Sequence, residues 1–180
     1  MALGKGHCSK PNKYMNNRNR LYGVLVNTWA LLEKTYHLHP IIYGSLGVEL
    51  ALEHDYDVHD IDLIIPDSHF DETKLAALFV NQGYEIIARS YFTVRKNDID
   101  VEISRLSYWE NVARFCNVKP IALTYENTIL HVLDIPNLLR LYEYLLTEPS
   151  RGGFKNERDE VKVKHLRAKM MGTAFQGTPL

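Results

Sequence analysis

Residues 41–64 constrain the fold of this chain more than any other segment. A short apolar run leads into Gly44 and Ser45, a helical pattern follows, and a second apolar run carries Asp60 and Asp62. Because successive strand side chains point to opposite faces, the two aspartates share one face while the apolar side chains between them face a core. Two like charges side by side on a strand cost stability unless a cation lies between them. The segment therefore predicts a strand, a helix and a second strand whose acidic face serves a function.

Composition limits the class of protein. The chain has 180 residues, 46% hydrophobic and 24% charged, which suits one globular domain with a substantial core. Its 21 Lys and Arg residues nearly balance its 22 Asp and Glu residues, so the net charge of −1 disfavours a general nucleic-acid binder. Cys8 and Cys116 have neither metal-ligand spacing nor a disulfide framework. No run is apolar enough for a membrane span or a secretory leader, so we expect a cytoplasmic protein with no membrane partner.

Periodicity along the chain predicts a mixture of helices and strands. We expect a loose basic arm at 1–18, a core at 19–135 and a C-terminal helical segment of the same domain at 136–180. Ser68, with Asp71 three residues later, resembles a capping box that opens a helix. The elements do not alternate regularly, which predicts an α+β fold with a mixed sheet flanked by helices. The other expected elements are helices at 19–37, 134–146 and 155–171, a strand at 84–88, hairpins of 91–95 with 99–103 and of 121–124 with 128–132, and an irregular or weakly helical stretch at 104–118.

Asp100 is a third acidic candidate. It lies in the predicted strand 99–103, whose polar face also carries Asp98 and Glu102 and can lie beside the first two aspartates. Any of these three carboxylates can be a third ligand; Asp100 is favoured because apolar residues flank it in a firm strand, whereas Asp98 belongs to the turn. Clustered carboxylate oxygens are what Mg²⁺ requires, and two such ions can hold both the attacking and the leaving oxygen of a phosphoryl or nucleotidyl displacement.

Gly44 and Ser45, at the start of the predicted helix before the acidic strand, add a candidate phosphate-binding site. Glycine allows close approach of the backbone, and the free N–H groups at a helix N-terminus attract phosphate. The order Gly44-Ser45, a gap of fourteen residues, Asp60-Ile61-Asp62, and later Ile99-Asp100-Val101 resembles the signature of the DNA polymerase β-like nucleotidyltransferase superfamily. The resemblance spans about residues 40–104. Small members, such as antibiotic nucleotidyltransferases and the minimal nucleotidyltransferases of toxin–antitoxin loci, are similar in size.

The resemblance implies a function and roles for these residues. Asp60 and Asp62 would be ligands of Mg²⁺, with two ions possible, and Asp100 would be the third ligand and the base that activates an acceptor hydroxyl. Ser45 would contact the terminal phosphates of a nucleoside triphosphate such as ATP. The gap before Asp60 is at the long end of the family pattern, so residues 55–59 would be an insertion near the site.

The last predicted helix carries a basic stripe that has two interpretations. The basic side chains can bind a triphosphate or a polyanionic acceptor, or they can form a solvated surface. The sequence favours the solvated surface. Lys155 and Arg158, at the helix start, nevertheless stay candidates for substrate binding, together with Gly44, Ser45 and Glu102. The stripe consists of Lys155, Arg158, Lys162, His165 and Lys169.

The sequence as a whole predicts a Mg²⁺-dependent nucleotidyltransferase. It would transfer a nucleoside monophosphate from a nucleoside triphosphate to a hydroxyl group and release pyrophosphate. A small molecule, a protein side chain and an RNA end all stay open as acceptors. One alternative is a catalytically silent binding module with the same fold, for example a toxin–antitoxin partner; another is a structural domain whose acidic face is merely solvated. His54 and His59 lack zinc-ligand spacing and are expected to be solvated.

Overall fold

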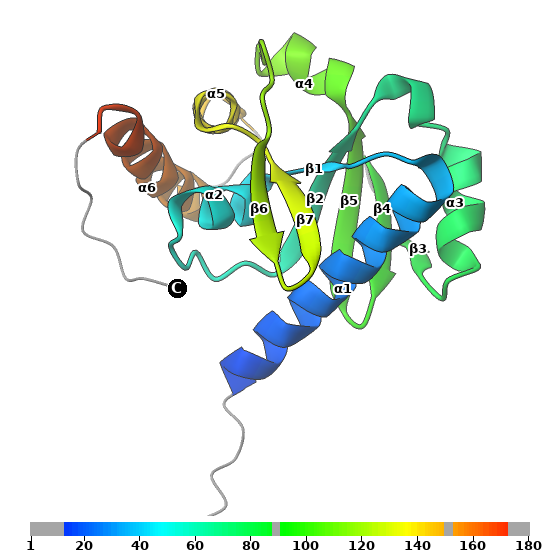
Figure 1. The fold of residues 1–180 in the computed structure, drawn as a ribbon. Coiled ribbons are helices and arrows are strands. Elements are labelled where there is room, and N and C mark those ends of the chain that lie inside the picture. Colours follow the sequence, from blue (N-terminus) through cyan, green and yellow to red (C-terminus); the bar gives the residue numbers. More distant parts are fainter. Residues whose placement is uncertain (1–12, 88–90, 150–152, 173–180) are drawn as a thin grey trace, which may run out of the picture.

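The computed structural model describes residues 13–87, 91–149 and 153–172. These residues form a seven-stranded sheet in the order β3-β4-β5-β2-β1-β7-β6 (Figure 1). The strands are β1 (Ile41–Tyr43), β2 (Asp60–Ile65), β3 (Glu85–Ile87), β4 (Phe92–Lys96), β5 (Ile99–Arg105), β6 (Ile121–Tyr125) and β7 (Thr128–Val132). The helices are α1 (Lys13–Tyr36), α2 (Gly44–Leu52), α3 (Glu72–Val80), α4 (Leu106–Val112), α5 (Ile135–Leu145) and α6 (Gly153–Met170), with one 3₁₀ turn at Asp67–His69.

The sheet is mixed, as predicted. Strand β1 pairs antiparallel with β2 and parallel with β7, and β2 pairs parallel with β5. The register places Tyr43 opposite Asp62, and Asp62 opposite Glu102 on the other side. The segments that follow β1, precede β2 and form the start of β5 therefore meet at one end of the central strands. Both expected hairpins, β4–β5 and β6–β7, are confirmed.

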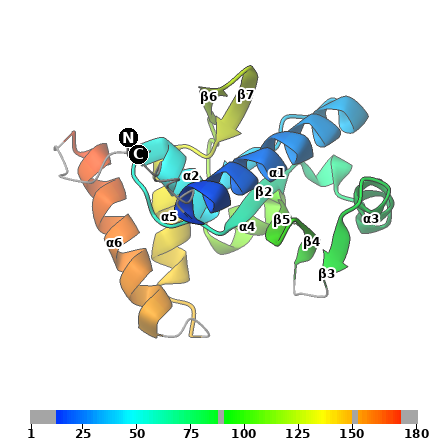
Figure 2. The same cartoon turned by 90° about the horizontal axis from the view of Figure 1, so that it is seen from below.

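Different helices cover the two faces of the sheet. Helices α1 and α3 pack against one face, where alternate residues of the central strands, among them Ile61, Leu63 and Val101, are fully buried. Helices α2, α4, α5 and α6 lie on the other face, with a second core that includes Tyr43 and Ile64. Figures 1 and 2 show α5 and α6 together on one side of the molecule and α3 on the opposite side. Because Asp60, Asp62 and Glu102 alternate with the first core, their side chains point to the face of α2, α5 and α6.

Helix α5 begins as the sequence predicts. The side chain of Asp134 accepts a hydrogen bond from the backbone N–H of Asn137, and Pro136 lies in the first turn, where its missing N–H costs nothing. The capping box predicted at Ser68 is wrong. Helix α3 begins at Glu72, and Asp71 is its cap, accepting a hydrogen bond from the N–H of Lys74.

Two other boundaries differ from the prediction. Helix α1 begins at Lys13 rather than at residue 19, and Arg18 in its early part forms a 2.7 Å ion pair with Glu49 of α2, which ties this turn to the fold. Residues 13–18 are thus helical and not part of an arm, and residues 1–12 of the predicted arm lie outside the described residues. The stretch at 104–118, expected to be irregular or weakly helical, contains the helix α4, and its Trp109 is buried against the second core. No helix within the described ranges is both long and apolar enough to cross a membrane.

Candidate active site

A cavity of about 490 Å³ opens on the face of α2, α5 and α6. The ends of the central strands form its acidic floor, the loop before β2 forms one wall, and α5 and α6 form the other. Most of the candidate residues from the sequence line it. The floor residues are Tyr43, Gly44, Ser45, Asp60, Asp62 and Glu102, and the walls include Asp57, Val58, His59, Leu141, Tyr142, Lys155, Arg158, Asp159 and Lys162.

Gly44 and Asp62 meet in the floor of the cavity. Gly44 has φ +62°, and a Cβ built on it would lie only 1.8 Å from Oδ2 of Asp62. Asp62 therefore occupies the space that any other residue at position 44 would need. Because Gly44 is also the first residue of α2, the carboxylate lies beside the positive end of this helix. The glycine motif and the acidic strand, separate in the sequence, form one site.

The structure brings Asp60, Asp62 and Glu102 to the cavity, whereas Asp100 does not line it. Asp100 lies opposite Asp60 in the β2–β5 register, so it shares their face of the sheet. Its carboxylate, however, accepts hydrogen bonds from Nε and Nη2 of Arg95, at 2.5 and 3.1 Å. Within the part of the chain that the structure describes, no three Asp, Glu, His or Cys side chains form a ready metal cluster. A metal held here would thus need further oxygens from a ligand or water.

A chain of hydrogen bonds fixes the carboxylate of Glu102. Nε1 of Trp109 donates to Oγ of Ser104 (2.8 Å), Ser104 donates to the hydroxyl of Tyr43 (3.2 Å), and Tyr43 donates to Oε1 of Glu102 (2.9 Å). Burial, together with the nearby charges of Asp62 and Glu102, raises the pKa of Tyr43 well above its usual value. Tyr43 therefore keeps its proton and acts as a permanent donor to Glu102.

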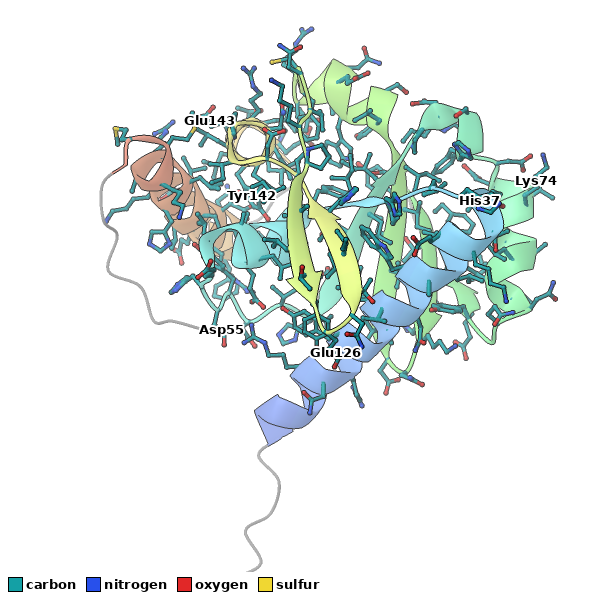
Figure 3. The ribbon with its side chains drawn as sticks, viewed as in Figure 1. His37, Asp55, Lys74, Glu126, Tyr142 and Glu143 are labelled. Carbon is teal, nitrogen blue, oxygen red and sulfur yellow. The ribbon has the colours of Figure 1, made fainter. Side chains whose placement is uncertain are left out.

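Lys162 is buried in the opposite wall, with only 4% of its surface exposed. Its Nζ donates to Oγ of Ser45 (2.9 Å) and to Oδ1 of Asp159 (3.3 Å), and it lies 4.7 Å from the centre of the Tyr142 ring. In Figure 3, Tyr142 lies between α5 and α2. The interpretation of the basic stripe as a solvated surface is thus wrong for Lys162, because α6 packs against α2 and α5 at this point.

The rest of the basic stripe divides between the cavity and the solvent. Lys155 and Arg158 line the cavity, and Arg158 also donates to the backbone carbonyl of Tyr56 (2.7 Å). His165 shares a 2.7 Å hydrogen bond with the hydroxyl of Tyr56. Lys169 is exposed, as the sequence favours.

The sequence did not identify several residues that lie at the site. Tyr43, Tyr142 and Trp109 look like ordinary core residues in the sequence, and only the fold shows that they line the cavity. The partnership of Asp159 with Lys162 could have been found from the sequence, since Asp159 is an acid three residues before Lys162 in a basic helix. His59, expected to be solvated, is exposed but lines the cavity beside Asp57.

Solved structures that superpose on this chain include nucleotidyltransferase-like proteins. An antigenic nucleotidyltransferase-like protein from Paracoccidioides brasiliensis superposes with a TM-score of 0.57 and 15% identity, over 82% of this chain and 75% of that protein. The antibiotic-resistance factor ANT(2'')-Ia in solution gives a TM-score of 0.56 and 17% identity, over 87% and 93% of the two chains. The chain has a nucleotidyltransferase fold. A crystal structure of ANT(2'')-Ia with adenylyl-2''-tobramycin shares this nucleotidyltransferase fold at a TM-score of 0.50 and 16% identity, over 83% and 96% of the two chains.

The comparison of sequences gives a relative of similar length. YnaI of Bacillus subtilis (strain 168), an uncharacterised protein, is 28% identical over 157 residues, which span 82% of this chain and 96% of YnaI. No family model matches the chain. The nucleotidyltransferase fold therefore rests on three-dimensional similarity, and agrees with the mixed sheet and flanking helices expected from the sequence.

Proposed function

We propose that this chain is a metal-dependent nucleotidyltransferase that moves a nucleoside monophosphate from a nucleoside triphosphate to an acceptor hydroxyl. The contact between Gly44 and Asp62 carries the proposal, because it joins a helix N-terminus suited to phosphate with a carboxylate suited to a metal. The opposite wall supplies the cations Arg158 and Lys162, which suit a polyanion in the same cavity. A volume of about 490 Å³ lies within the range of small-molecule sites.

Asp60 and Asp62 are the proposed ligands of Mg²⁺, with Glu102 as the third carboxylate at the site. All three supply oxygen atoms, which is the donor set of a hard cation. A ready cluster of three is not needed, since Mg²⁺ usually binds one or two carboxylates and completes its shell with water and substrate phosphates. When bound, Mg²⁺ neutralises charge on the phosphate oxygens. Asp100, the third ligand expected from the resemblance, stays a prediction that requires its carboxylate to leave Arg95.

The triphosphate would lie between the N-terminus of α2 and helix α6. Lys162 already donates to Ser45, so an ammonium group and a hydroxyl are held together beside the first turn of α2. Arg158 and Lys155 add two further positive groups to the lining of the cavity. Because guanidinium groups bind phosphate in a fixed geometry, Arg158 would orient the leaving phosphates.

The reaction would be an in-line displacement at the α-phosphorus. The acceptor oxygen forms a bond to this phosphorus, the bond to the α,β-bridging oxygen breaks, and pyrophosphate leaves with its electron pair. Glu102 is the proposed group that takes the proton of the acceptor hydroxyl, and the bond from Tyr43 holds its carboxylate in place. Positioning and charge neutralisation would supply most of the rate.

A small hydroxyl-bearing molecule is the proposed acceptor class. The net charge of −1 gives no support for binding a long nucleic acid. ANT(2'')-Ia, which shares the fold, holds an adenylylated tobramycin in its crystal structure. Protein side chains and RNA ends are the other acceptors to be compared.

Calorimetric titration with each nucleoside triphosphate and Mg²⁺ tests the proposal. Wild-type protein should bind at least one nucleotide in a Mg²⁺-dependent manner, and Asp62→Asn should lose this dependence. Asp98→Asn is the matched control, since Asp98 is 86% exposed and outside the cavity, and it should bind normally. Release of pyrophosphate from labelled nucleotide in the presence of candidate acceptors tests turnover. Binding that ignores Mg²⁺ and Asp62→Asn, without pyrophosphate release, would support the silent binding module instead.

A further inference from the structure

Tyr56 connects the loop before β2 to the surrounding helices. This loop, residues 53–59, runs from the end of α2 to Asp60, and Asp55 marks it in Figure 3. The N–H of Tyr56 donates to Oε2 of Glu49 (3.0 Å), and its carbonyl accepts from Arg158 (2.7 Å). Its hydroxyl shares a 2.7 Å hydrogen bond with Nδ1 of His165. One residue in the middle of the loop is thus held through its amide, its carbonyl and its side chain.

The partners of Tyr56 are themselves fixed. Glu49 is 2% exposed on α2, and its other carboxylate oxygen accepts from Arg18 of α1 at 2.7 Å. His165 lies one turn from Lys162 on α6, and its ring is 5.5 Å from that of His54. Helices α1, α2 and α6 therefore converge on the loop at Tyr56.

These attachments bear directly on the cavity, although Tyr56 does not line it. The next three residues, 57–59, form one wall, and Arg158 belongs to the opposite wall. Arg158 bridges the two, because its Nη2 reaches the carbonyl of Tyr56 and, at 3.5 Å, that of Asp57. A displaced Tyr56 would move the loop wall and release the guanidinium that faces it.

We propose that Tyr56 is a positioning residue that holds Arg158 and residues 57–59 in the geometry needed to bind a nucleoside triphosphate. The inference rests on the proposed function for the identity of the ligand. The hydroxyl of Tyr56 acts through His165, which anchors the Tyr56 side chain to α6. The carbonyl of Tyr56 acts through Arg158. Tyr56 takes no part in the chemical step, which the residues that line the cavity would carry out.

Substitutions that remove the hydroxyl–imidazole bond from either side test this role. Tyr56→Phe and His165→Leu should each weaken ATP binding in the presence of Mg²⁺ by about 2- to 10-fold, the range of one neutral hydrogen bond. The double variant should be no weaker than either single variant, since both remove the same bond. His165→Asn should retain most of the affinity, because an Asn side chain places a polar atom close to the position of Nδ1.

Hydrogen exchange gives a readout independent of nucleotide. Tyr56→Phe and His165→Leu should speed amide exchange at residues 56–59 and leave the amides of β2 and β5 unchanged. Tyr125→Phe is the matched control, since Tyr125 stacks on Tyr22 and lies outside the cavity, and it should alter neither measurement.

The outcomes separate the inference from the proposed function. A wild-type protein that binds no nucleoside triphosphate refutes the proposed function, and the exchange rates then decide whether Tyr56 ties the loop to α6. If wild-type protein binds ATP, the inference is overturned by additive effects of the two substitutions. It is equally overturned if Tyr56→Phe changes neither the affinity nor the exchange at residues 56–59.

Discussion

Replacing Gly44 by alanine tests the contact on which the candidate site depends. The new Cβ would lie 1.8 Å from Oδ2, 2.7 Å from Cγ and 3.0 Å from Cβ of Asp62. Real Cβ atoms do not approach other atoms this closely, so the carboxylate or the backbone must move. The positive φ of +62° adds backbone strain, because side chains disfavour this conformation. Both effects act in the folded state and should lower the free energy of unfolding.

The magnitude follows from these two contributions. Left-handed backbone strain costs about 1–2 kcal/mol for a non-glycine residue, and overpacking costs about 1–3 kcal/mol. We therefore expect Gly44→Ala to lower the free energy of unfolding by about 2–5 kcal/mol. Gly83→Ala isolates the strain, since Gly83 has φ +76° and no atom within 4 Å of a built Cβ, and should cost about 1–2 kcal/mol. Gly23→Ala, in helix α1 with no atom within 4 Å, should stabilise by about 0.5–1 kcal/mol.

Urea unfolding with linear extrapolation measures the three differences in free energy. Adding Asp62→Ala to Gly44→Ala removes the two closest atoms and leaves the Cβ contact at 3.0 Å, so the double variant should recover most of the loss that exceeds the Gly83→Ala effect. If Asp62 instead rotates away, the stability loss falls toward the Gly83→Ala value but Mg²⁺-dependent nucleotide binding disappears. A Gly44→Ala variant that matches Gly83→Ala in stability and still binds metal and nucleotide like wild type would refute the reasoning.

Three further predictions concern the walls of the cavity. Lys162→Met leaves the buried carboxylate of Asp159 without this ammonium partner and should lower the free energy of unfolding in urea by about 3–5 kcal/mol. Adding Asp159→Leu should recover part of this stability. A loss below about 1 kcal/mol for Lys162→Met would contradict the prediction. Tyr43→Phe removes the donor to Glu102, so it should cost about 1–3 kcal/mol and slow pyrophosphate release more than it weakens nucleotide binding; an unchanged rate argues against Glu102 as the base. Burial, and then two neighbouring basic side chains, lower the pKa of His165, so its contribution to stability is present above the unfolded pKa of about 6.5 and is lost as pH falls through the folded pKa. His165→Asn should flatten this fall in urea titrations between about pH 5 and 8, and identical profiles for the two proteins would exclude the effect.

The sequence by itself determined the local elements and the acidic face. Alternation placed Asp60 and Asp62 on one face of a strand, and Asp134 with Pro136 marked the start of α5, because these features depend only on neighbours along the chain. The sequence placed Gly44-Ser45 and the two aspartates on consecutive elements, and the resemblance to the nucleotidyltransferase signature implied that they serve one site. The false capping box at Ser68 shows the limit of such patterns, since Asp71 accepts the hydrogen bond itself.

Only the tertiary structure decided which charged side chains share the cavity. The β2–β5 register sets Glu102 beside Asp62, while the β4–β5 register sets Arg95 opposite Asp100, where it binds the carboxylate that the sequence favoured. Lys162 likewise belongs to the cavity because α6 packs on α2 and α5, not because of its spacing in the helix. Strand register and helix packing are set by burial of apolar residues far apart in the sequence, so the partners of a charged side chain cannot be derived from its neighbours along the chain.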